Sequence, residues 1–200
     1  MRIIRNLFAP GVVLTLLLTA SSLSAASKKD PPKPTVEQCL ACHSDASLTH
    51  EVNGKQVSLH VDPEAFKNSI HGSMFTCVDC HADVKSAAHE TTPKKISCAS
   101  CHADQQAAYD RSHHAKAVAS GNSNAATCVD CHGSPHDLLP ASDPKSRVSH
   151  ANIPATCGAC HGQKLVMADG GQSAHMVASY GQSVHGHAVA NGSAKAAVCT

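Results

Sequence analysis

A five-residue pattern, Cys-x-x-Cys-His, constrains the fold of this chain more than any other feature. It occurs five times and uses ten of the eleven cysteines and five of the sixteen histidines. Two copies are identical, with Val-Asp between the cysteines in both. The chain must therefore place five chemically equivalent groups. Their cysteines are Cys39/Cys42, Cys77/Cys80, Cys98/Cys101, Cys128/Cys131 and Cys157/Cys160, and their histidines are His43, His81, His102, His132 and His161.

This pattern is the attachment signature of c-type haem. The two thiols add to the two vinyl groups of one porphyrin, and the next residue places its imidazole under the iron. The alternatives for a single copy are a zinc half-site or a redox dithiol. Zinc sites do not require a histidine directly after each second cysteine, and redox dithiols do not occur in fives. The sequence predicts five haem c groups, with the five motif histidines as proximal iron ligands.

The start of the chain, 1–26, is typical of a secretory signal. Arg2 and Arg5 precede an apolar run over 7–20, and small residues at 24–26 suit cleavage. The alternative is an uncleaved anchor, for which the run is short. We expect an exported mature chain without a membrane span, in the periplasm or at the outer surface, with a Pro/Lys linker at 27–38 and a haem domain over 39–200.

Composition predicts a weak protein core. Aromatic residues make up 2% of the chain and tryptophan is absent. Few large apolar side chains give little burial energy, so covalent haem would have to supply the missing apolar mass. We expect a mainly α fold with extensive loops and little β, organised around the haems.

The net charge gives no sign of a nucleic-acid partner. Loss of Arg2 and Arg5 with the signal changes the formal net charge from +1 to −1, and the sequence has no basic tract of the kind that binds nucleic acid.

Local signals predict several elements. The Asn53-Gly54 pair predicts a hairpin within 48–61. Asp62-Pro63 predicts a helix start, with the helix running to about Ile70 and ending near Gly72. Further helices are expected at 103–113 and 172–184, and a loop at 133–146.

An internal repeat organises the haem domain. Tyr109 and Tyr180 each begin a Tyr-x-x-Ser-x-His segment, and each stands at the same interval before a cysteine, Cys128 and Cys199. The repeats start near 66, 109 and 180. Cys199 is therefore expected to be the first cysteine of a sixth haem motif, in a protein that continues past residue 200. The alternative is one unpaired cysteine.

Each haem needs a second axial ligand. Eleven histidines lie outside the motifs, and the methionines show no recurrent placement, so bis-histidine ligation is expected. The Ser-x-His residues occupy one repeat position, and two further histidines follow a motif closely. The distal candidates are thus His71, His114, His185, His89 and His136. His50, His60, His150 and His175 are less favoured, and His113 is an alternative to His114.

Short spacing between motifs predicts haems in near contact. The motifs that begin at Cys77 and Cys98 are the closest together, with little polypeptide between them.

The chain resembles the multihaem c-type cytochromes of bacterial respiration. The resemblance lies in its five motifs, the Ser-x-His-Gly elements at His71 and His185, and the Cys-His-Gly-x-x-His element ending at His136. The resemblance implies a chain of haems used as an electron conductor.

Three functions follow from this resemblance. The favoured one is electron transfer between redox protein partners, without catalytic residues. The alternative is part of a reductase of nitrogen or sulfur oxyanions, which needs an open iron position; the C-x-x-C-K motif frequent in nitrite-reductase relatives is absent. The third is a haem-stabilised module that passes electrons to a downstream catalytic domain.

Overall fold

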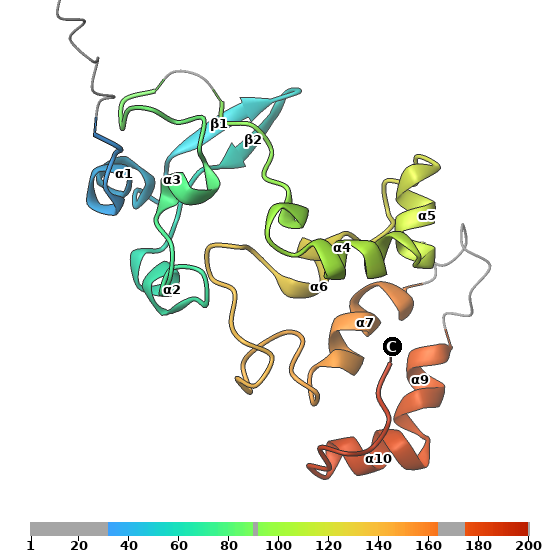
Figure 1. Cartoon of the computed structure of the whole chain (residues 1–200). Helices are drawn as coiled ribbons and strands as arrows, with labels where there is room; N and C mark the ends of the chain where they lie inside the picture. Colours follow the sequence, from blue (N-terminus) through green and yellow to red (C-terminus); the bar gives the residue numbers. More distant parts are fainter. Residues whose placement is uncertain (1–31, 90–91, 164–174, 200) are drawn as a thin grey trace, which may run out of the picture. The chain divides into compact units, whose positions relative to one another are not determined.

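Short helices joined by loops make up most of this computed structural model, which describes residues 32–89, 92–163 and 175–199 (Figure 1). The mainly α expectation is confirmed. The described residues belong to a compact unit, Pro32–Thr200. The helices are α1 (Val36–His43), α2 (Pro63–Asn68), α3 (Cys77–Cys80), α4 (Ala103–Asp110), α5 (His113–Ala119), α6 (Cys128–His132), α7 (Ile153–His161), α9 (Met176–Gly181) and α10 (Val184–Ala190), with a 3₁₀ turn, η1, at Cys98–Ser100.

The cysteine motifs lie on short helical turns: α1, α3, η1, α6 and α7. In α3, the backbone N–H and hydroxyl of Thr76 both donate to the Asp79 carboxylate, at 2.8 and 2.7 Å. In α6, Thr127 does the same to Asp130, at 2.7 and 2.6 Å. The aspartate shared by the two identical motifs therefore closes the helix start, which explains its position between the cysteines.

Each Ser-x-His element begins a new helical turn. Ser112 and Ser183 are the N-caps of α5 and α10, and their hydroxyls accept from the backbone N–H three residues later, at 3.1 and 3.0 Å. The Ser69 hydroxyl accepts in the same way from Gly72, at 2.9 Å. A serine cap therefore fixes the start of the turn that carries the histidine two residues later.

The repeat has a structural counterpart. The Tyr109 hydroxyl donates to Ala126 O at 2.9 Å, and the Tyr180 hydroxyl donates to Ala197 O at 3.0 Å. Each tyrosine thus holds the backbone two residues before a cysteine, Cys128 or Cys199. The first repeat begins with Phe66, which has no hydroxyl to make this bond.

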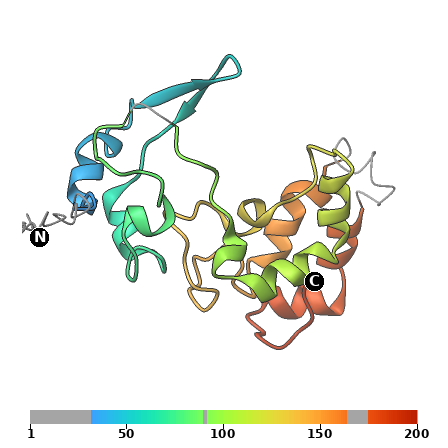
Figure 2. The same ribbon diagram turned by 45° about the horizontal axis from the view of Figure 1, so that its top comes forward.

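The predicted hairpin is confirmed. Strand β1 (Thr49–Val52) pairs antiparallel with β2 (Lys55–Ser58), and both are seen as blue arrows in Figures 1 and 2. Asn53 and Gly54 have φ of 51° and 77°, as a two-residue hairpin turn requires. Every residue of both strands is exposed, so the hairpin is held by its turn and its ladder.

Three helix bounds differ from the prediction, because serine caps divide the chain. The helix from Pro63 ends at Asn68, where Ser69 becomes extended. The predicted helix 103–113 is two helices, α4 and α5, separated at Ser112. The predicted helix 172–184 starts outside the described residues, and its described part breaks between α9 and α10 at Ser183. Residues 133–146 contain no helix or strand, as predicted.

Other predicted boundaries concern the start of the chain. The predicted signal, 1–26, lies outside the described residues. Within the predicted linker, residues 36–38 already belong to α1, where the Thr35 hydroxyl caps the helix by accepting from Gln38 N. In the described ranges, no helix is both long and apolar enough to cross a membrane.

The polypeptide buries few apolar side chains. In the part of the chain that the structure describes, the buried apolar residues are Val78 and Val189. Phe75 is 43% exposed and Met74 is 62% exposed. The helices are therefore held mainly by caps and hydrogen bonds, with little hydrophobic burial to stabilise their packing.

Candidate haem sites

Four of the five motif histidines face a second imidazole ring. In every case the second ring belongs to a histidine outside the motifs, and the distances between ring centroids are similar. The pairs are His43–His89 at 6.2 Å, His81–His136 at 6.3 Å, His102–His71 at 6.1 Å and His161–His114 at 5.9 Å.

This separation fits two axial ligands on one metal. Metal–imidazole bonds of about 2 Å, with each ring nitrogen about 1 Å from its ring centre, put the two centres about 6 Å apart. The described residues contain no group of three or more His, Cys, Asp or Glu placed to hold a bare ion. A porphyrin supplies four ligands itself, so a pair of histidines beside two cysteines fits haem.

Two of the pairs share one arrangement, with one pair in each of the first two repeats. His71 precedes the Cys77 motif but faces His102, which belongs to the next motif. His114 precedes the Cys128 motif and faces His161, again one motif further on. In both repeats, the Ser-x-His element therefore places its histidine opposite the proximal histidine of the second motif that follows it.

The other two pairs run backwards along the chain. His89 follows the Cys77 motif and faces His43, from the preceding motif. His136 follows the Cys128 motif and faces His81, two motifs back. The four distal candidates in these pairs therefore come from the two segments that surround α3 and α6.

Hydrogen bonds at Nδ1 orient two of these rings. His43 Nδ1 is 2.8 Å from Leu59 O, and His71 Nδ1 is 3.4 Å from Pro135 O. A proton on Nδ1 that is donated to a carbonyl leaves Nε2 free for a metal and makes the ring more basic. By contrast, the Nδ1 atoms of His81 and His161 are buried and have no hydrogen-bond partner among the residues that the structure describes. The motif histidines therefore differ in their polar surroundings.

Burial favours the neutral form of one pair. It lowers the pKa of His81 and the pKa of His136, because the charged imidazolium loses hydration. Charge repulsion from His81 lowers the pKa of His136 further. Neutral imidazole is the form that binds a metal, so this pair is prepared for ligation at neutral pH.

The first thiols of successive motifs lie beside one another. Burial, together with the neighbouring thiol of Cys39, raises the pKa of Cys77 to about 11. Burial and a thiol neighbour also raise the pKa of Cys128, beside Cys98, and that of Cys157, beside Cys199. These thiols are therefore protonated at neutral pH when no group is bound to them.

The second thiols of the last two motifs, Cys131 and Cys160, are half-buried and free. Burial, followed by the negative charge of Asp130, raises the pKa of Cys131, and Cys160 adds to this shift. Cys160 lies on α7, where its backbone carbonyl accepts from Gln163 N at 2.9 Å. Because neither thiol forms a disulfide, both are available for covalent attachment, and their bonds to a porphyrin remain predictions.

Two predicted histidines are not brought to such a partner. Among the described residues, His132 and His185 face no second imidazole at this separation, and both are exposed. His150 Nε2 contacts Ala196 O at 2.8 Å, and His50 Nε2 lies 3.4 Å from Thr92 Oγ1. These two less favoured histidines therefore bond to the protein itself.

The sequence reasoning missed Arg147, which lies at the fourth motif. Its guanidinium Nη2 donates to Asp130 O at 2.8 Å. The two residues are too far apart in the sequence for any local signal of this contact. Arg147 also lines a pocket of about 270 Å³ together with His132, Asp137 and Lys145.

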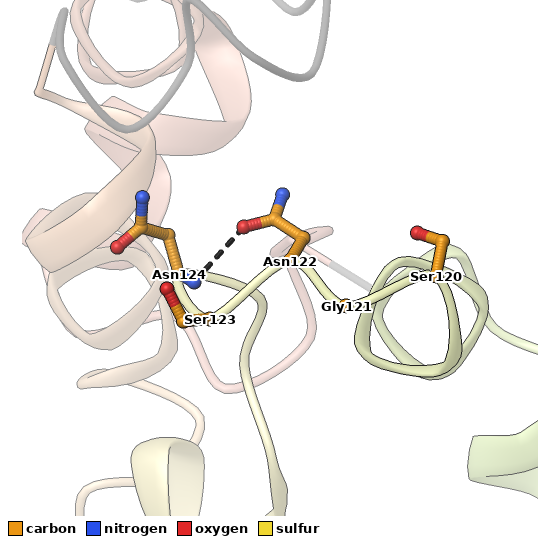
Figure 3. Close-up of a pocket in the computed structure, with 5 residues that line it drawn as sticks. All are labelled: Ser120, Gly121, Asn122, Ser123 and Asn124. Carbon is orange, nitrogen blue, oxygen red and sulfur yellow. Dashed lines mark hydrogen bonds between the residues drawn. The ribbon is translucent and has the colours of Figure 1, made fainter.

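A second hollow lies on the loop after α5 and has no ionisable side chain. It is formed by residues 120–124, where Asn124 N donates to Asn122 Oδ1 at 2.9 Å (Figure 3). Its lining is Ser, Gly and Asn, which offers no acid, base or thiol. This loop therefore adds nothing to the chemistry of the histidine pairs.

No family model, curated protein or solved structure matches the chain.

Proposed function

We propose that this chain is an electron-transfer protein that holds five covalent c-type haems close together. Each cysteine motif bonds one porphyrin, and its histidine is the proximal iron ligand. The observation that carries the proposal is the set of four imidazole pairs, because each combines a motif histidine with a histidine from elsewhere in the chain at a separation suited to one shared metal.

Two imidazoles at each of four irons favour electron transfer over catalysis at those sites, whereas among the described residues His132 of the fourth motif has no such pair. A six-coordinate iron has no open position for substrate, and bis-histidine ligation favours low reduction potentials relative to Met/His ligation. When bound, the haem irons would supply one-electron exchange. The protein's own part is to hold the thiols, orient the imidazoles and keep neighbouring haems close.

Shared segments support close haem spacing. The segment 71–89 contains the Cys77 motif, and it also supplies His71 opposite His102 and His89 opposite His43. The segment 114–136 contains the Cys128 motif and supplies ligand candidates opposite the motif histidines of α7 and α3. A segment that bonds one haem and ligates two others keeps all three within a short distance, as a conductor requires.

The proposed location and partners follow from the predicted export signal. Haem c is attached outside the cytoplasm, so the protein would work in the periplasm or at the cell surface. Its donor and acceptor would be other redox proteins. The exposed motif positions, including Cys42, Cys80 and Cys101, would leave haem edges accessible to such partners.

Haem counting tests the proposal. The chain is expressed with its leader in a host that matures c-type cytochromes, and haem is counted by intact mass and pyridine haemochrome. We expect five haems per chain, and four in the variant Cys98→Ala/Cys101→Ala. The control Cys199→Ala should keep five, because the motif at Cys199 is incomplete in this chain. Absence of covalent haem from the parent protein would refute the proposal.

A further inference from the structure

Arg147 is hydrogen-bonded to the fourth motif and to the residue that directly precedes the fifth. Its Nη2 donates to Asp130 O at 2.8 Å, inside the fourth motif. Its own carbonyl accepts from the Thr156 hydroxyl at 2.6 Å, and Thr156 directly precedes Cys157 of the fifth motif. A single residue thus ties α6 to the start of α7.

The stem of Arg147 packs on the residue after the fourth motif histidine. Gly133 has φ of 91°, and a Cβ built on it would lie 3.4 Å from Arg147 Cδ. A side chain held along its stem and at its guanidinium loses little further freedom when it interacts with a ligand. Arg147 is exposed, and these two contacts keep its positive charge beside the fourth motif.

The pocket at His132 has a net positive lining. Arg147 and Lys145 each contribute one positive charge, and Asp137 contributes one negative charge. The Asp130 carboxylate lies outside this lining and accepts from Thr127. Asp130 directly precedes Cys131, so its negative charge opposes the effect of Arg147. The positive charges of Arg147 and Lys145 would stabilise an electron arriving on a haem at His132, and the negative charges of Asp130 and Asp137 would destabilise it.

We propose that Arg147 sets the reduction potential of the haem at Cys128, Cys131 and His132, and holds this site in register with the one at Cys157. This inference rests on the proposed function. One-electron reduction of ferric haem lowers the charge of the site by one, so a fixed cation beside it stabilises the ferrous form. Arg147 is a positioning residue, since it acts on the haem through charge and through α6.

The test is a redox titration of the haem-loaded protein, followed haem by haem by NMR. We expect R147M to lower the potential of the fourth haem while all five haems stay attached. R147K, which keeps the charge, should retain most of the wild-type potential. The shift in R147M should shrink at high ionic strength, because salt screens the charge.

Arg111→Met is the matched control. Arg111 is an exposed arginine at the C-terminal end of α4. Its loss should leave the potential of the fourth haem unchanged. If R147M does not accumulate, Arg147→Gln gives the same neutral comparison. The inference is overturned if the fourth haem has the same potential in wild type and in the neutral variant. It is also overturned if R147K shifts this potential as much as R147M does. Failure of the proposed function would give a different result from failure of this inference, because the parent protein would then carry no haem.

Discussion

The glycine after the first and third Ser-x-His elements, where the second element has Ala115, shows how one residue controls a ligand candidate. A Cβ on Gly72 would lie 1.8 Å from Phe66 O, and one on Gly186 would lie 2.1 Å from Tyr180 O. These separations leave no room for any side chain. The turn that carries His71 can therefore fold tightly against the end of α2 only with glycine at position 72.

Gly72→Ala should detach His71 from its partner ring. The methyl group forces the turn away from Phe66 O, so the iron at the Cys98 motif loses its second imidazole. We expect one more haem per chain than in wild type to bind carbon monoxide when reduced, measured by optical titration. Gly181→Ala is the control, because a Cβ there meets nothing within 4 Å. Full resistance of Gly72→Ala to carbon monoxide would contradict the assignment.

At the scale of elements, α3 and α6 depend on ionised aspartates. Hydrogen bonds from the Thr76 backbone and hydroxyl lower the pKa of Asp79, and the Thr127 hydroxyl and backbone lower the pKa of Asp130. A carboxyl group with a lowered pKa in the folded state stabilises that state fully above its unfolded pKa of about 3.9. The contribution is lost as the pH falls through the folded value.

Asp130→Asn should therefore matter most at neutral pH. We expect the variant to be less stable than wild type at pH 7. The difference should shrink as the pH falls below about 3.9, because the carboxylate of the unfolded chain then takes up a proton, and it should vanish once the folded carboxylate is protonated at its own lower pKa. Guanidinium unfolding of the haem-loaded wild type and variant at several pH values across this range measures the difference in their free energies of unfolding. Glu51→Gln, on exposed strand β1, should show no such trend. A difference for Asp130→Asn that is constant with pH would refute the capping account.

The whole molecule combines many local hydrogen bonds with a very small apolar core. Val78 and Val189 are the buried apolar residues of the described part, and polar Ser69, Ser146 and Ser149 are buried too. Such a polypeptide gains little from hydrophobic burial, while ordering its backbone costs about 1–2 kcal/mol per residue. Covalent haem would add the missing apolar surface between the helices.

The haem-free protein should therefore be largely unfolded. Substituting alanine for the ten motif cysteines removes covalent attachment and keeps the rest of the sequence. We expect weak helical circular dichroism and no cooperative thermal transition, in contrast to the haem-loaded protein. A sharp transition in the haem-free chain would show that the polypeptide is stable on its own.

Local features were predictable from sequence. The hairpin follows from Asn53-Gly54, and the start of α2 follows from Asp62-Pro63, because each signal acts within a few residues. The break at Ser112 was missed, since a serine within a helical pattern was not interpreted as a cap. These outcomes reflect short-range chemistry, which a single sequence carries.

The histidine pairs were beyond such reasoning. Three of the five distal candidates came from the recurrent Ser-x-His position and two from histidines that closely follow a motif, and four of the five face a motif histidine. Which candidate faces which motif could not be predicted, because partners such as His81 and His136 belong to distant segments of the chain. Pairing at that range is set by the packing of separate turns. Arg147 was missed for the same reason.

The spin state of the iron tests the central claim, that the four imidazole pairs are axial ligands. An EPR spectrum of the oxidised, haem-loaded protein should show low-spin bis-histidine signals from at least four irons per chain. These signals should not change when nitrite or hydroxylamine is added. High-spin iron at these four sites, shifting with either ligand, would contradict the account and favour an oxyanion reductase.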